Sequence, residues 1–123
     1  MKIFWIRHLP IAGTGRYIGH TDIPIIIPAS PAKIVPLPEN ALWFASPLKR
    51  AVATANWLLE DIYNKNTKLK LADELMEQNF GAWENKKYEE VWGNWQNQDP
   101  ATVKPDGGES FVELCRRVDI WLE

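Results

Sequence analysis

Short apolar runs along the chain predict buried β-strands. Residues 3–6 are all apolar and too few for a helix, so they indicate a strand buried on both faces, as in a parallel sheet. Residues 41–45 form a second apolar run of strand length, and residues 68–72 favour a third short strand. The chain is therefore expected to contain a sheet whose strands are mainly parallel.

The segment after the second apolar run has the pattern of an amphipathic helix. Ser46 is a candidate N-cap, and Pro47 fits the first helical position. The apolar positions that follow lie 4, 3, 4 and 3 residues apart, at Leu48, Val52, Ala55, Leu59 and Ile62. This spacing predicts a helix with one apolar face that continues to about residue 63.

Two further helices are predicted in the second half of the chain. The first ends near Asp99 and Pro100, and its apolar positions are Tyr88, Val91, Trp92 and Trp95. The last begins at a capping box formed by Ser110 and Glu113. It continues to the end of the chain through Phe111, Leu114, Cys115, Val118, Trp121 and Leu122.

The connection between the first two apolar runs is predicted to be irregular. Residues 24–38 contain five prolines, which exclude a long helix there. The resulting order is strand, loop, strand, helix, strand, helix, helix. This order is typical of an α/β protein with a mainly parallel central sheet flanked by helices.

Composition narrows the classes of function. The 123 residues suit one domain, and a net charge of −2 without a dense basic run makes nucleic acid a poor candidate partner. No apolar run approaches the length of a membrane span or a secretory signal. A single cysteine, Cys115, excludes an intrachain disulfide and fits a cytoplasmic setting. Two histidines and one cysteine argue against a zinc site.

The candidate chemistry lies where two predicted strands end. Arg7 and His8 follow the first strand, and Arg50 lies in the first turn of the helix that follows the second. Ligands of open α/β sheets bind beyond the carboxyl ends of the strands, and a helix N-terminus favours an anion. Two guanidinium groups and a helix start therefore predict a phosphate site, although each of these residues alone would more often be structural.

Five separated segments resemble the histidine phosphatase superfamily, also called phosphoglycerate mutase-like. They are "IRHLP", "YIGHTDIP", "SPLKRAVATA", "LMEQNFGAWE" and "GGESFVELCRRV", and they span nearly the whole chain. The form "RHLP" and the tyrosine-x-glycine before "TD" look most like α-ribazole phosphatase relatives. The resemblance implies the phosphoglycerate mutase-like fold, with residues 1–123 as the N-terminal portion of the domain.

The resemblance also implies roles for individual residues. His8 matches the nucleophile that becomes a phosphohistidine, Arg7 and Arg50 match the phosphate-binding arginines, and Glu77 matches the proton donor to the leaving oxygen. The implied activity is hydrolysis of a phosphate monoester of a small metabolite, with α-ribazole phosphate as one candidate, and it requires no metal or other cofactor. Phosphoglycerate mutase-type transfer and a non-catalytic phosphate-binding or interaction module are the alternatives.

One family feature is missing. Members carry a second histidine in a later Ser-His-Gly segment, and this chain stops before that point. His20, the only other histidine, lies in "YIGHTD" and does not match that motif, so it is expected at the surface or facing the substrate. A fragment of a longer protein, a disrupted gene and a homo-oligomer in which a second chain supplies the missing strand are the three explanations left open.

Overall fold

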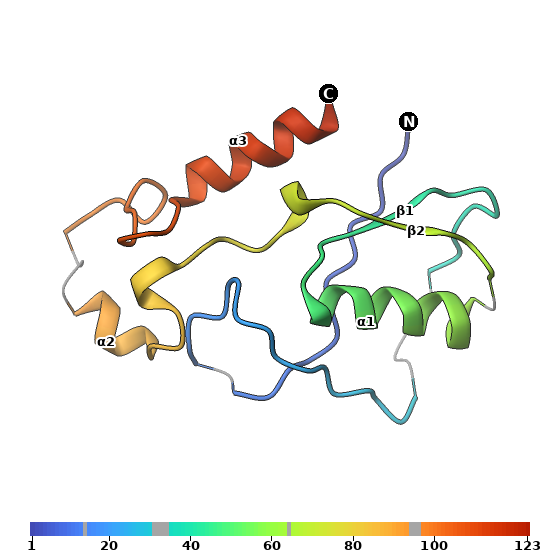
Figure 1. The fold of residues 1–123 in the computed structure, drawn as a ribbon, viewed down its shortest axis with the longest axis horizontal. Helices are drawn as coiled ribbons and strands as arrows, with labels where there is room; N and C mark the ends of the chain where they lie inside the picture. Colours follow the sequence, from blue (N-terminus) through green and yellow to red (C-terminus); the bar gives the residue numbers. More distant parts are fainter. Residues whose placement is uncertain (14, 31–34, 64, 94–96) are drawn as a thin grey trace. The chain divides into compact units, whose positions relative to one another are not determined.

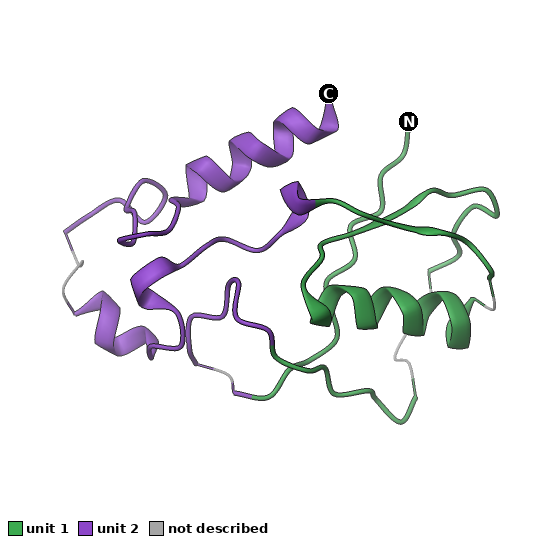
Figure 2. Ribbon diagram, viewed as in Figure 1, with its two compact units in different colours: residues 1–12, 23–72 green, residues 13–22, 73–123 purple. Residues whose placement is uncertain are grey.

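The computed structural model describes residues 1–13, 15–30, 35–63, 65–93 and 97–123. These residues form two compact units (Figure 2). Unit 1 comprises residues 1–12 and 23–72, and unit 2 comprises residues 13–22 and 73–123. His8 and Arg50 thus belong to unit 1, whereas Glu77 belongs to unit 2.

Unit 1 is built on a β-α-β arrangement (Figure 1). Strand β1 (Trp43–Ala45) pairs in parallel with β2 (Leu69–Leu71), with Trp43 opposite Leu69. Between them, helix α1 (Lys49–Trp57) continues into a π-helical turn, η1 (Leu58–Ile62). The fold is therefore α/β with parallel strands, as the sequence predicts, and both predicted strands after residue 40 are confirmed.

The buried apolar side chains of unit 1 come from β1, α1, η1 and the residues next to α1 and β2. They are Trp43, Ala45, Leu48, Ala55, Leu59 and Ala72. The ring of Tyr63 meets that of Trp43 edge-on, with 5.8 Å between ring centroids. The predicted apolar face of α1 therefore does contribute to a core.

The prediction of a buried strand at residues 3–6 is wrong. These residues have no strand pairing, and Ile3, Phe4, Trp5 and Ile6 are 43–64% exposed. A strand buried on both faces needs neighbouring strands and a layer on each side. Among the described residues the sheet has two strands, β1 and β2, and neither pairs with residues 3–6. An apolar run shows that a segment is suited to burial but not which segment covers it.

Helix α1 begins later than the sequence predicts. Leu48, with extended backbone angles of −60° and 136°, occupies the N-cap, so Ser46 is not the cap and Pro47 is not the first helical residue. The Oγ of Ser46 instead accepts a hydrogen bond from the N–H of Leu48 at 3.2 Å. This local turn uses the serine side chain two residues ahead of the N-cap.

Unit 2 has short helical elements joined by loops. In chain order these are η2 (Asp73–Leu75), η3 (Gly81–Trp83), α2 (Tyr88–Trp92) and α3 (Phe111–Leu122). Residues 15–17 run antiparallel to residues 85–88, with the N–H of Tyr17 donating to the carbonyl of Lys86 at 3.0 Å. The Tyr17 ring lies 4.9 Å from Phe80 and 5.5 Å from Trp83 between centroids, and these rings form the core with Val91 and Val103.

The two helices predicted in this half are present. Helix α2 ends at Trp92, earlier than expected, and Trp95 lies outside the described residues. The capping box of α3 is confirmed, because Ser110 Oγ accepts from Glu113 N at 3.2 Å and Glu113 Oε2 accepts from Ser110 N at 2.8 Å. Helix α3 has no buried residue, so its predicted apolar face is not part of the described core. Within the described ranges, we find no helix with the length and apolarity that a membrane span requires.

Candidate active site

His8 is half-buried and its ring orientation is set by a backbone contact. Its Nδ1 lies 2.6 Å from the carbonyl oxygen of Leu9. A carbonyl only accepts hydrogen bonds, so this contact assigns the proton of a neutral ring to Nδ1. The Nε2 atom then carries the free lone pair, which is the condition for a nucleophile.

The residue after His8 is tied to the first two turns of α1. The N–H of Leu9 donates to Thr54 Oγ1 at 2.9 Å, and Thr54 Oγ1 donates to the carbonyl of Arg50 at 2.7 Å. A second contact, from Ile26 N to the carbonyl of Pro10 at 2.7 Å, holds the other end of this segment. The backbone beside His8 is therefore fixed to the helix that carries Arg50.

Arg50 is the second residue of α1 and is almost fully buried, at 2% exposure. The first turn of this helix holds Lys49 and Arg50 and no acidic residue. Positive side chains, together with the positive end of the helix dipole, favour an anion at this place. The local charge thus agrees with the predicted phosphate site.

Arg7 is exposed. That the side chains of Arg7, His8 and Arg50 converge on one phosphate stays a prediction. The contacts above hold the backbone beside His8 and do not place the ends of these side chains. No group of three or more histidine, cysteine or acidic side chains within the described ranges is arranged to bind a metal ion.

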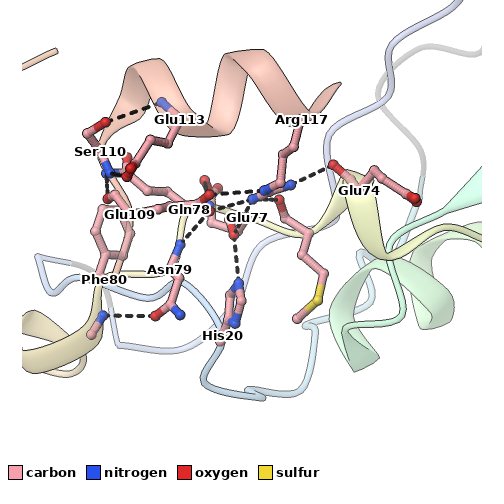
Figure 3. A network of polar contacts seen from close by, with 12 residues as sticks. His20, Glu74, Glu77, Gln78, Asn79, Phe80, Glu109, Ser110, Glu113 and Arg117 are labelled. Atoms are coloured by element: carbon pink, nitrogen blue, oxygen red, sulfur yellow. Dashed lines mark hydrogen bonds and ion pairs between the residues drawn. The ribbon is translucent and has the colours of Figure 1, made fainter. Parts of the chain in front are cut away.

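Glu77 lies in unit 2, on the irregular segment between η2 and η3 (Figure 3). Its side chain is exposed, and Oε1 accepts a hydrogen bond from the N–H of Gln78 at 2.8 Å. Its carbonyl oxygen lies 3.0 Å from Nε2 of His20 and accepts from Nη2 of Arg117 at 3.1 Å. His20 therefore contacts the segment that carries Glu77, which sequence reasoning did not anticipate.

The side chain of Arg117 reaches from α3 to three backbone carbonyls, one in η2 and two in the segment after it (Figure 3). It donates to the carbonyls of Glu74 at 2.5 Å, Met76 at 2.7 Å and Glu77 at 3.1 Å. It also forms a two-point ion pair with Glu109, at 3.1 Å from Nε and 2.6 Å from Nη2. We call Arg117 and Glu109, with the three carbonyls, the Arg117 clasp.

Glu109 is itself bonded to the neighbouring backbone. Its Oε1 accepts from Asn79 N at 3.0 Å, its own N–H donates to the carbonyl of Asn79 at 2.8 Å, and its carbonyl accepts from Gln78 Nε2 at 2.8 Å. Partial burial raises the pKa of the Glu109 carboxyl, but the hydrogen bonds from Arg117 and Asn79 and the positive charge of Arg117 outweigh it, so the pKa falls below its ordinary value.

A second carboxylate, that of Glu84, holds the turn at residues 19–21. Its two oxygens accept hydrogen bonds from Gly19 N at 3.1 Å, His20 N at 2.8 Å and Thr21 Oγ1 at 2.7 Å. Burial raises the pKa of Glu84, but these bonds and one from Phe80 N together lower it below its ordinary value.

Sequence reasoning missed Glu84, Glu109 and Arg117, although all three lie in segments that it singled out. The available signal was weak. Glu109 immediately precedes the capping box, and Arg117 follows it two turns later on the same helix. Nothing in this spacing indicates that both side chains contact residues 74–79.

Comparison with known proteins gives a family match and several similar structures. Residues 32–123 match the family model described as the histidine phosphatase superfamily (branch 1). This range contains Arg50 and Glu77, whereas Arg7 and His8 precede it. No curated protein sequence matches the chain.

Two similar structures are about one quarter identical in sequence to this chain over the matched region. The protein TTHB049 from Thermus thermophilus is 26% identical with a TM-score of 0.66, and the match covers 95% of this chain and 68% of that one. An Escherichia coli K-12 protein described as "a putative alpha-ribazole-5'-P phosphatase" is 25% identical with a TM-score of 0.68, covering 88% of this chain and 57% of that one.

A third structure shows similarity of fold. The α-ribazole phosphatase from Shigella flexneri has a TM-score of 0.71 at 24% identity, and the match covers 95% of this chain and 63% of that one. The chain thus spans between 57% and 68% of the length of these three proteins.

Proposed function

The chain belongs to the histidine phosphatase superfamily (branch 1), and from this premise we propose that it acts as a phosphomonoesterase through a phosphohistidine intermediate. The single observation that carries the proposal is the contact from His8 Nδ1 to the Leu9 carbonyl, which leaves Nε2 with its lone pair. A neutral imidazole with a pKa near 6.5 is a competent nucleophile at neutral pH.

The proposed reaction has two steps, phosphoryl transfer to His8 and hydrolysis of the phosphohistidine. In the first, Nε2 of His8 attacks phosphorus, the bond to the leaving oxygen breaks, and that oxygen takes its electron pair and a proton from the Glu77 carboxylic acid. In the second, water attacks the phosphohistidine, the ionised Glu77 takes a proton from it, and the P–N bond breaks to release phosphate. Arg7 and Arg50 bind the non-bridging oxygens and hold the phosphoryl group in line.

The substrate proposed is a small phosphorylated metabolite, with α-ribazole phosphate preferred. The support is the 25% identity to the Escherichia coli protein described above, together with the "RHLP" and "YIGHTD" segments. We further propose that the protein acts on this substrate in the cytoplasm and has no nucleic-acid or membrane partner. A homo-oligomer remains an expectation.

The test is an assay of hydrolysis and of the covalent intermediate. The protein translated from its complete reading frame, and separately the 123-residue chain, are incubated with p-nitrophenyl phosphate and with α-ribazole phosphate. We expect base-stable, acid-labile phosphate on His8 after rapid quenching, and a loss of at least about 10³-fold in kcat/KM in the His8→Ala variant. We expect the 123-residue chain on its own to have little activity.

A matched pair of variants tests the role of Glu77. The Glu77→Gln variant is expected to lose about 10²-fold or more on an ester with a poor leaving group, because it has no proton to give. The control is Glu74→Gln, an exposed glutamate of η2 three residues before Glu77. Equal rates for wild type and His8→Ala would contradict the enzyme hypothesis and leave the binding-module alternative, while transfer between positions of a phosphoglycerate would favour the mutase alternative.

A further inference from the structure

We propose that Arg117 and Glu109 are positioning residues for the Glu77 carboxyl group, an inference that rests on the proposed function. Between η2 and η3 the backbone of residues 76–80 has no helix or strand. A loop of this kind keeps one conformation only when side chains satisfy its polar groups. The Arg117 clasp provides these contacts at the point where the proton donor is attached.

Arg117 fixes the carbonyl side of this segment. Its guanidinium donates to the carbonyls of Glu74, Met76 and Glu77 at 2.5–3.1 Å. These carbonyls lie within one short stretch, so a planar group with donors in several fixed directions is required to bind them together. A lysine ammonium keeps the charge but lacks the planar fork, and it would not hold all three.

Glu109 fixes the orientation of Arg117. The two side chains in this ion pair are only 24% and 17% exposed, so water competes with it less than with a surface pair. The same carboxylate accepts from Asn79 N, and the backbone of Glu109 bonds to residues 78 and 79. The guanidinium is therefore placed relative to the segment that it binds.

The consequence for Glu77 is a fixed side-chain direction. Its carbonyl contacts both Arg117 and His20, and its own Oε1 accepts from the N–H of Gln78 at 2.8 Å. With the backbone held on both sides, the Cα–Cβ bond of Glu77 points one way although the side chain itself is exposed. A displacement of about 1 Å in such a donor costs on the order of 10²-fold in rate.

A positioning role differs from a structural role in its dependence on the leaving group. p-Nitrophenolate leaves readily without a proton, whereas an alkoxide needs one. Displacing Glu77 should therefore slow hydrolysis of an alkyl phosphate, such as glycerol 2-phosphate, far more than hydrolysis of p-nitrophenyl phosphate. A general loss of folded protein would slow both equally.

The experiment compares Arg117→Lys and Glu109→Gln with the wild type and with Arg116→Lys, all in the protein from the complete reading frame. Arg116 is the exposed neighbour of Arg117 on α3 and provides the same substitution without the clasp. For Arg117→Lys and Glu109→Gln we expect kcat/KM to fall at least about 10-fold on glycerol 2-phosphate and less than about 3-fold on p-nitrophenyl phosphate. Arg116→Lys should match the wild type on both substrates.

Epistasis and amide exchange complete the test. Adding Arg117→Lys to Glu77→Gln should cause no further selective loss on the alkyl ester, because both act on one proton transfer. The amide of Asn79, which bonds to Glu109 Oε1, should exchange faster in Glu109→Gln. Equal losses on the two esters, or no loss, would overturn the positioning role. A wild-type protein that hydrolyses neither ester would instead overturn the proposed function and, with it, this inference.

Discussion

The two units hold their candidate site residues in different ways. Unit 1 places Arg50 on a regular helix, and the segment after His8 reaches that helix through Thr54. Unit 2 places Glu77 on an irregular loop that is held by side chains, chiefly the carboxylate of Glu109 and the guanidinium of Arg117. In unit 1 secondary structure holds the candidate site residues, whereas in unit 2 charged side chains bonded to the backbone do so.

This difference indicates which property of each unit a substitution should change. Substituting an arginine of unit 1 should weaken phosphate binding more than it lowers stability, because helix α1 still supports the fold. Changing a carboxylate or a close backbone contact in unit 2 should affect stability, because hydrogen bonds to charged groups replace regular structure there.

The largest effect is expected for Arg50→Lys in unit 1. A lysine retains the charge but not the two-point binding of phosphate, so we expect the affinity for orthovanadate or inorganic phosphate to fall on the order of 10²–10³-fold. Titration calorimetry measures this without requiring turnover, and Arg116→Lys is the control. A folded Arg50→Lys protein that binds as tightly as wild type would show that this helix start is not the phosphate site.

The next effect is expected for Gly19→Ala in unit 2. A methyl group at this position would overlap the carbonyl oxygen of Gln78 and would lie 2.5 Å from Oε1 of Glu84. The backbones must separate to admit it, so we expect the free energy of unfolding to fall by about 2–3 kcal/mol. The control is Gly93→Ala, where the nearest atom is the Glu89 carbonyl at 3.4 Å and little change is expected. Urea unfolding measures both, and equal effects would contradict the close approach.

The elements of unit 1 were largely predictable because their signals are local. Apolar spacing located α1, a short apolar run located β1, and the predicted short strand at residues 68–72 located β2. The same reasoning failed for residues 3–6, since burial of a strand depends on neighbours that the run itself does not specify. In the candidate site, the helix that carries Arg50 was predictable for the same local reason, although its first residue was not.

In unit 2 the sequence predicted helices α2 and α3, and it located the start of α3 because the capping box involves residues three apart. The other determinants of unit 2 are contacts between distant residues. Glu84 bonds to Gly19 across 65 positions, and Arg117 bonds to Glu77 across 40. A carboxylate that accepts backbone hydrogen bonds has no characteristic periodicity, so the pattern of the sequence could not distinguish Glu84 or Glu109 from solvated residues.

A moderate effect is expected on the acid stability of unit 2. Because the pKa of Glu84 is lower in the folded protein than its ordinary value, the unfolded chain binds the proton more readily. The stability that this carboxylate contributes is therefore fully present above the ordinary pKa and is lost as pH falls through the folded pKa. We expect the free energy of unfolding to decline as pH is lowered below about 5.

The Glu84→Gln variant isolates this contribution. At neutral pH we expect it to be about 1–2 kcal/mol less stable than wild type, because its bonds to Gly19, His20 and Thr21 lose their charge. Its stability should also decline less steeply with acid, although Glu109 still contributes. Glu60→Gln, an exposed glutamate of unit 1, is the control. Parallel curves for Glu84→Gln and wild type between about pH 4 and pH 6 would contradict the role of this carboxylate.

The smallest effect is expected for Lys104→Met, which separates exposed ion pairs from carboxylates bonded to the backbone. Lys104 Nζ lies 2.9 Å from Glu113 Oε1, and the two side chains are 55% and 40% exposed. Water and salt screen such a pair, so the change in the free energy of unfolding should be much smaller than for Glu84→Gln. Glu113 keeps its hydrogen bond from Ser110 N in this variant, and the cap of α3 survives. If Lys104→Met were as damaging as Glu84→Gln, then net charge pairing, rather than hydrogen bonding of carboxylates to the backbone, would be what holds unit 2 together.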